Sequence, residues 1–236
     1  MNRITRVTRF HLVKRLEFFV VPLSILLLVL AVSIIVALAI QRTGADTSSP
    51  DYIAGAKQNM AIIWSMPGFL IYYGVQAVAT SYPLALSLGT TRRNFILGTF
   101  IANAIQSAFV AILLVAMLGL ELVTNHWFMS VYVLDTFLMG DGNPITLFIT
   151  AFIGVLVCLT LGGFFGAVWV RFGPKGPMVV GLALGLLLAL TVLIIAPRIG
   201  EVFAAITSAK MTIAAAVVLV LALGGTWFAM RRASVR

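Results

Sequence analysis

Six long apolar runs divide this chain of 236 residues, and they leave few folds open to it. Each run holds about 20 residues or more, the length at which a helix crosses the apolar core of a bilayer. Lipid cannot satisfy exposed backbone groups, so such runs cross as helices. Only 10% of the residues are charged, whereas a soluble domain carries roughly a quarter. The sequence therefore predicts an all-α membrane protein with transmembrane helices near residues 19–40, 61–86, 95–120, 145–170, 178–197 and 211–230.

The charged residues between these runs are sorted by sign. One side collects 12 of the 16 Lys and Arg residues with Glu17 as its one acid, which gives +11, and the other side sums to −2. Basic loops stay in the cytoplasm, so both termini are predicted to be cytoplasmic. Nucleic-acid binding needs a basic patch on a folded soluble surface, and the sequence predicts none. The basic residues of the cytoplasmic side are Arg3, Arg6, Arg9, Lys14, Arg15, Arg92, Arg93, Arg171, Lys175, Arg231, Arg232 and Arg236.

Residues 1–18 form a basic segment ahead of the first run. Ile4, Val7 and Phe10 recur every three residues with arginines beside them. The pattern is compatible with an amphipathic helix on the anionic inner leaflet and equally with a short basic tail that sets topology. The first run exceeds the roughly 7–15 apolar residues of a cleaved signal peptide. We therefore expect a retained anchor, and one six-helix transmembrane domain over residues 19–236.

No catalytic constellation is evident in the sequence. His11 and His126 lie outside the runs, and no acid or base sits in the middle of one, which disfavours a proton- or ion-coupled carrier and a lipid-modifying enzyme. The His-Glu-x-x-His zinc motif is missing, and the only Gly-Lys-like stretch, residues 173–176, lacks the spacing of a phosphate-binding loop. The chain is predicted to be no enzyme, to carry no metal or cofactor, and to use Cys158 for packing.

Neutral polar side chains stand out in the second and third runs. Those of the second run recur every four residues and share one helix face. Two interpretations stay open: interhelical hydrogen bonding, or the lining of a transport path. The residues are Tyr72, Gln76 and Thr80 in the second run and Asn103, Gln106 and Ser107 in the third.

Small residues recur every four positions in two later runs, as Gly162 with Gly166 and as Gly181 with Gly185. This spacing lets membrane helices approach closely, so we expect both pairs to pack helices. Residues 121–144, on the side opposite the termini, are rich in aromatics and are expected to rest at the membrane interface.

The loop between the second and third runs is a helix exit followed by a re-entry. Gly89 suits the left-handed position just after a helix, and Thr90 or Thr91 suits the N-cap of the next one. Arg92 and Arg93 then hold the turn on the cytoplasmic side.

Residues 82–98, which include this turn, resemble the inner turn of permease subunits of bacterial type-2 ABC exporters. The resembling segment is under a tenth of the chain, while the six-span outline with both ends inside covers all of it. The residues that match the family's pattern are Pro83, Leu86, Gly89, Thr91, Arg92, Arg93, Phe95 and Gly98.

The resemblance implies a type-2 exporter bundle in the bacterial plasma membrane. It implies that the turn docks on a separate cytoplasmic ATPase, which supplies ATP and Mg, and that a second copy or a paralogue completes the permease. Re-entrant helices of that family precede its last span, and residues 198–210 leave room for one short helix at most. The alternative is a non-transporting membrane immunity or assembly protein. The residues implied in coupling are Leu86, Gly89, Thr90, Thr91, Arg92, Arg93, Asn94 and Phe95.

Overall fold

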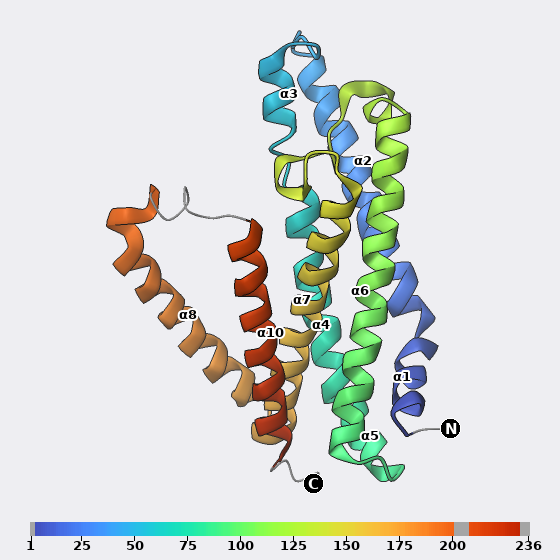
Figure 1. The fold of residues 1–236 in the computed structure, drawn as a ribbon, viewed down its shortest axis with the longest axis vertical. Helices are drawn as coiled ribbons and strands as arrows, with labels where there is room; N and C mark the ends of the chain where they lie inside the picture. The colour runs from blue at the N-terminus through green and yellow to red at the C-terminus, as the bar shows by residue number, and fades with distance from the viewer. Residues whose placement is uncertain (1–2, 201–207, 232–236) are drawn as a thin grey trace.

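A computed structural model describes residues 3–200 and 208–231, and Figure 1 shows this part as an elongated helical bundle. Within these ranges the chain contains helices and no strand. The expected short helix of residues 198–210 falls largely outside them. The helices are α1 (Arg3–Val13), η1 (Leu16–Val20), α2 (Val21–Gln41), α3 (Pro50–Ala56), α4 (Ala61–Ala79), α5 (Ser81–Ser87), α6 (Arg92–Val123), η2 (His126–Ser130), η3 (Phe137–Met139), α7 (Pro144–Phe172), α8 (Lys175–Ile195), η4 (Ala196–Arg198) and α10 (Ser208–Arg231).

The helical class and the six membrane-capable helices are confirmed. In the described ranges, six segments are long and apolar enough to cross a membrane. The third of them, α6, has 32 residues and is about 48 Å long at 1.5 Å per residue, well beyond the roughly 30 Å of a bilayer core. The six segments are Leu16–Gln41, Pro50–Ser87, Arg92–Val123, Pro144–Phe172, Lys175–Arg198 and Ile213–Arg231.

The second span is not one continuous helix. It is interrupted at Thr80, between α4 and α5. Pro83 has no N–H for the carbonyl of Ala79 and crowds that carbonyl, which favours a break at this point, although α4 itself continues through Pro67. The Thr80 hydroxyl donates to the Gln76 carbonyl at 2.7 Å. The break makes α5 a short separate helix directly ahead of the basic turn.

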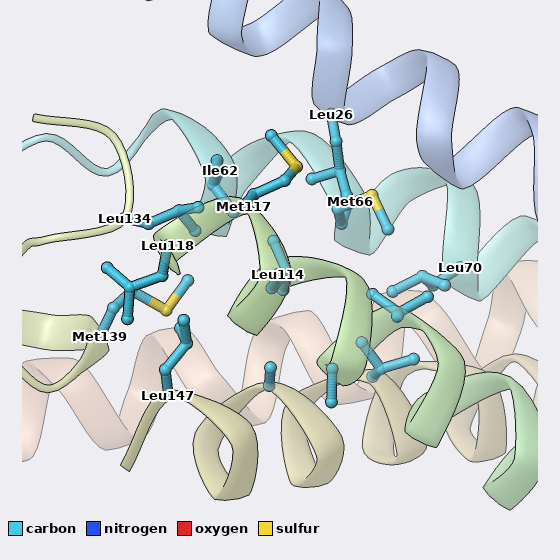
Figure 2. Close-up of a cluster of buried hydrophobic side chains, with 14 of the residues drawn as sticks. Leu26, Ile62, Met66, Leu70, Leu114, Met117, Leu118, Leu134, Met139 and Leu147 are labelled. Carbon is cyan, nitrogen blue, oxygen red and sulfur yellow. The ribbon is translucent and has the colours of Figure 1, made fainter. Parts of the chain in front are cut away.

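The core is built by α4, α6 and α7, with α2 alongside. Figure 2 shows its apolar side chains converging from these helices and from the loop between α6 and α7. The approach of α4 to α7 is at backbone distance, because a Cβ placed on Gly162 would lie 2.8 Å from the Cα of Gly74. The labelled residues of the cluster are Leu26, Ile62, Met66, Leu70, Leu114, Met117, Leu118, Leu134, Met139 and Leu147.

The last two long helices are attached differently. Helix α10 packs on α7 through its second half, where Ala222, Thr226, Ala229 and Met230 are buried. Helix α8 leans away from the bundle (Figure 1), and none of its side chains is buried against the described residues. Its surface is apolar throughout, as expected of a helix covered by lipid.

The two described ends of the chain lie at the same end of the bundle, as Figure 1 shows. Arg92, at the start of α6, donates a hydrogen bond to the carbonyl of Arg231, the last described residue. This "basic end" also carries Arg6, Arg9 and Lys175. Its cytoplasmic orientation stays a prediction from charge.

The opposite end is closed by a folded loop, residues 124–143, which we call the cap. The Glu121 carboxylate, with no exposed surface, accepts hydrogen bonds from the backbone N–H groups of Val133, Leu134 and Asp135 at 3.0, 2.9 and 3.1 Å. Charge-assisted bonds of this kind are stronger than neutral ones. The aromatic segment is thus folded over the end of the bundle, with Phe128 and Phe137 exposed, and its place at the membrane interface stays a prediction.

Candidate functional site

Helix α1 is fastened lengthwise to the first turns of α6. The Thr8 hydroxyl donates to the Gly98 carbonyl at 3.1 Å, and His11 Nε2 lies 3.1 Å from the Thr99 hydroxyl. A Cβ on Gly98 would lie 2.7 Å from Val7, so glycine is what admits α1. Burial, reinforced by Lys14, lowers the pKa of His11 to about 4, so the imidazole is neutral at physiological pH. The basic segment therefore packs on the protein with its buried face.

The turn between α5 and α6 is closed by backbone hydrogen bonds. Gly89 has φ +75°, its N–H donates to the Leu86 carbonyl at 2.9 Å, and the N–H of Thr90 donates to the Ala85 carbonyl at 3.0 Å. These two bonds define a Schellman C-cap. Thr91 is the N-cap of α6, and its hydroxyl accepts from the Asn94 N–H at 3.3 Å. A turn capped on both sides holds its shape.

The residues implied in coupling differ in how far they are buried in the bundle. Phe95 is buried and meets the Tyr82 ring edge-on, with centroids 5.2 Å apart. Leu86, Thr90 and Asn94 are half-buried, whereas Gly89 and Thr91 to Arg93 are exposed. Arg92 is tied to α10 through Arg231. Arg93 makes no ion pair or side-chain hydrogen bond with any described residue, so its charge is presented outward.

A groove of about 400 Å³ separates α1 from α5 and the turn. Its walls are apolar apart from Arg6 and a few hydroxyls. The side chains that shape it are Val7 and Phe10 of α1, Leu84 and Leu88 beside the turn, and Phe95 of α6. Any structure that docks on the turn would meet α1 as well.

The two polar clusters predicted from the sequence are not brought together. Asn103, Gln106 and Ser107 of α6 are all buried inside the bundle. The Ser107 hydroxyl donates to the Asn103 carbonyl at 2.8 Å, and neither amide atom of Gln106 has a hydrogen-bond partner among the described residues. Burial of this kind is what helix packing within one chain produces, so the arrangement fits interhelical packing, and the path-lining interpretation of these residues stays a prediction.

The cluster of α4 faces outward instead. Tyr72 is 61% exposed, Thr80 is exposed and Gln76 is half-buried. Trp64 and Gly68 continue the same spacing of four residues and are also exposed. We call these five residues the α4 stripe. Phenol, amide and hydroxyl groups are costly to leave against lipid, so the stripe is suited to a polar path or to a second membrane protein.

The two glycine pairs have different surroundings despite their identical spacing. A Cβ on Gly166 would lie 2.7 Å from the Val75 carbonyl oxygen, so Gly162 and Gly166 both contact α4 closely. No atom of the described residues lies within 4 Å of a Cβ placed on Gly181 or Gly185. The second pair is therefore available to lipid or to another chain.

The ion-pair network of the cap was not anticipated from the sequence. Lys57, just before α4, lies 3.3 Å from Asp135 and 2.6 Å from Asp141, and His126 Nε2 lies 3.0 Å from Asp135. These partners are 9 to 84 residues apart, so no local pattern signals them. Among the described residues no cluster of His, Cys, Asp or Glu could hold a metal ion.

Comparison with models of protein families, with curated protein sequences and with solved structures finds no match to the chain.

Proposed function

We propose that the chain is the membrane-spanning permease subunit of an ATP-driven ABC exporter of the bacterial plasma membrane. A separate cytoplasmic ATPase would bind the basic turn and supply ATP and Mg, and a second copy or a paralogue would complete the path. The observation that carries the proposal is the turn itself: rigidly capped, exposed at Arg93, and placed at the head of the longest helix. The resemblance of residues 82–98 to the permease turn supports the same interpretation.

The arrangement around the turn fits a coupling role. Phe95 and Tyr82 join α5 to α6, and Gly98 and Thr99 join α6 to α1. A push on the turn would thus move α1, α5 and the foot of α6 together. The break at Thr80 separates α5 from α4, and the α4 stripe ends at the same residue. In the proposal the shift opens a path along the α4 stripes of two facing permease subunits, a two-state change biased by ATP at a distance.

Arg93 gives a sharper test than Arg92, because Arg92 also holds α10. We expect Arg93→Glu to abolish co-purification of an ATPase with the tagged chain from native membranes after mild cross-linking. Lys175→Glu makes the same charge change at an exposed position of another loop at the basic end and should leave the complex intact. The ATP hydrolysis of each eluate gives the second readout.

The alternative outcome points to another class of protein. A chain that is recovered without any ATPase in both the wild type and Lys175→Glu would contradict the permease proposal. It would favour the immunity or assembly protein, for which α8, with no buried residue, offers a surface for contact with another membrane helix.

A further inference from the structure

A second cavity lies at the cap end, between α2, α3 and the cap, on the opposite end from the basic turn. Its volume is about 440 Å³, within the range of small-molecule sites. We call it the outer pocket. Its lining comes from α2 (Val32, Ser33, Val36, Ala37, Ile40), from α3 and the residues after it (Asp51, Tyr52, Gly55, Ala56, Asn59, Ala61), and from the cap (Ser130, Val131, Tyr132).

The walls of the outer pocket are fixed to one another by side chains. Tyr52 of α3 donates to the Ser130 carbonyl at 3.4 Å, Asn59 donates to the Tyr132 carbonyl at 3.0 Å, and Gln41 at the end of α2 donates to the Met129 carbonyl at 2.6 Å. Three separate segments are therefore joined around the space. A pocket braced in this way exists before a ligand arrives, which lowers the cost of ordering on binding.

One wall of the pocket is apolar surface of α2. Val32, Val36 and Ile40 line it and are each about half exposed on α2, a helix whose other side packs on α4. Eight residues separate Val32 from Ile40, about 12 Å along a helix, and both lie in the segment Leu16–Gln41, which is long and apolar enough to cross a membrane. With both termini cytoplasmic, as predicted from charge, this wall would lie in the outer half of the bilayer. An amphiphile could enter from the outer leaflet without crossing water.

The polar groups of the pocket define the head that it would accept. Asp51 is the one charged residue that lines it, and its carboxylate has no ion pair with any described residue. Lys57, six residues further on, does not line the pocket and is engaged by Asp135 and Asp141. On the wall of α2, the buried Ser33 adds a hydroxyl group to the lining. An unpaired carboxylate beside an apolar wall is complementary to a cation that carries an apolar body.

We propose that the outer pocket binds an amphiphilic organic cation, with its ammonium group at Asp51 and its apolar chain along α2. As a binding site this stands on the pocket alone. As the class of substrate that is released to the outer leaflet, it rests on the proposed exporter function. Anionic amphiphiles, such as acidic lipids, would be repelled by Asp51.

The test is photolabelling of the purified chain in phosphatidylcholine nanodiscs, without ATP or an ATPase. The probe is a dodecyl trimethylammonium ion with a photoactivatable group in its chain, and the matched neutral probe carries a hydroxyl in place of the ammonium group. Labelled peptides are located by mass spectrometry. We expect the cation to label residues 32–40 and 51–61 well above α8, which is apolar, has no buried residue and therefore reports unspecific partition.

Three protein variants distinguish the contribution of the probe's ammonium head group from that of its alkyl chain. Asp51→Asn should lower labelling by the cation about two- to fivefold, as expected for one partly hydrated charge pair, and leave the neutral probe unchanged. Asp46→Asn, in the same loop but outside the pocket, should change neither. Gly55 lines the pocket with no atom of the described chain within 4 Å of an added Cβ, so Gly55→Leu should fold normally and reduce labelling by both probes.

Equal labelling of α2 and α8 by the cation would overturn the site, and equal labelling by the two probes would overturn the role of Asp51. Neither result would bear on the permease proposal, because no ATPase takes part. Conversely, pocket labelling with no ATPase found in native membranes would keep the site and remove its role in export.

Discussion

Replacing Glu121 tests how the cap is held over the bundle. Its two carboxylate oxygens accept three backbone N–H bonds, one from Leu134 on Oε2 and two on Oε1. In Glu121→Gln the amide oxygen can keep the two bonds of Oε1, but the NH₂ group then faces the N–H of Leu134. One buried donor left unsatisfied costs about 1–3 kcal/mol, which corresponds to about a 5- to 150-fold rise in the local opening constant.

Glu121→Ala removes both acceptor oxygens and with them all three hydrogen bonds. By the same figures the loss is on the order of 3–9 kcal/mol, comparable to the whole stability of a domain at roughly 5–15 kcal/mol. We expect the cap to detach while the bundle below it stays folded, because the apolar contacts of α4, α6 and α7 do not depend on Glu121. The change is thus local, and a method that resolves single segments is needed to see it.

Hydrogen exchange of residues 131–136 in detergent is the measurement. Exchange should accelerate about 5- to 150-fold in Glu121→Gln, and further in Glu121→Ala, with α6 and α7 unchanged. Glu17→Gln is the matched control, since Glu17 is an exposed acid at the other end of the bundle, 3.5 Å from Lys14. Unchanged exchange of residues 131–136 in Glu121→Ala would refute the reasoning, because the cap would then be held by other contacts.

Three further predictions concern the bundle and α1. Gly162→Leu should lower the midpoint of thermal unfolding through a clash worth about 1–3 kcal/mol or more, whereas Gly154→Leu on the same helix, with no described atom within 4 Å of its Cβ, should not; equal midpoints would show that α4 and α7 can separate at no cost. Gln106→Leu should raise the same midpoint of thermal unfolding, since it removes a buried amide without hydrogen-bond partners among the described residues. Gln76→Leu should instead reduce transport. If Gln106→Leu lost transport with an unchanged midpoint, Gln106 would be assigned to the lining of the transport path. The pKa of His11 is lowered to about 4 when α1 is packed on α6, so packing favours the neutral imidazole. The free energy that holds α1 on α6 should therefore fall by up to about 3 kcal/mol as pH drops from about 6.5 toward 4. Spin-label distances between α1 and α6 should lengthen over that range in the wild type and not in His11→Phe, and a constant wild-type distance would contradict the burial of the imidazole.

The sequence predicts best those features of the structure that depend on neighbouring residues, such as helix caps. Gly89 after α5 and a threonine N-cap before α6 follow from the conformations that those residues favour, and both are found, with Thr91 as the cap. The break at Thr80 follows from Pro83 in the same way, although the apolar run itself reads straight through it. These features need only residues a few positions apart.

The polar residues of α4 and α6 show what the local sequence pattern does not predict. The spacing of four residues places Tyr72 and Gln76 on one face of α4, with Thr80 at its C-cap, but it cannot tell whether that face meets protein or lipid. Gln106 and Tyr72 are both neutral polar residues within apolar runs, yet Gln106 is fully buried and Tyr72 is 61% exposed. In a helix of a soluble protein, the apolar side shows which face packs on the core. A membrane helix is apolar on every side, so its sequence does not show which face packs on protein.

The helical class, the six membrane-capable segments, the sorting of charge and the caps of the basic turn can all be predicted from the amino-acid sequence, because length, hydropathy and backbone preference act within a single segment. Three contacts emerge only from the folded bundle: Gly162 lies against α4 while Gly181 contacts no described residue, Glu121 binds the cap, and α1 fits against Gly98. Each of these depends on which helix lies opposite and at what rotation. That choice is made by the packing of the whole bundle, where close backbone approach and the satisfaction of buried polar groups are settled together.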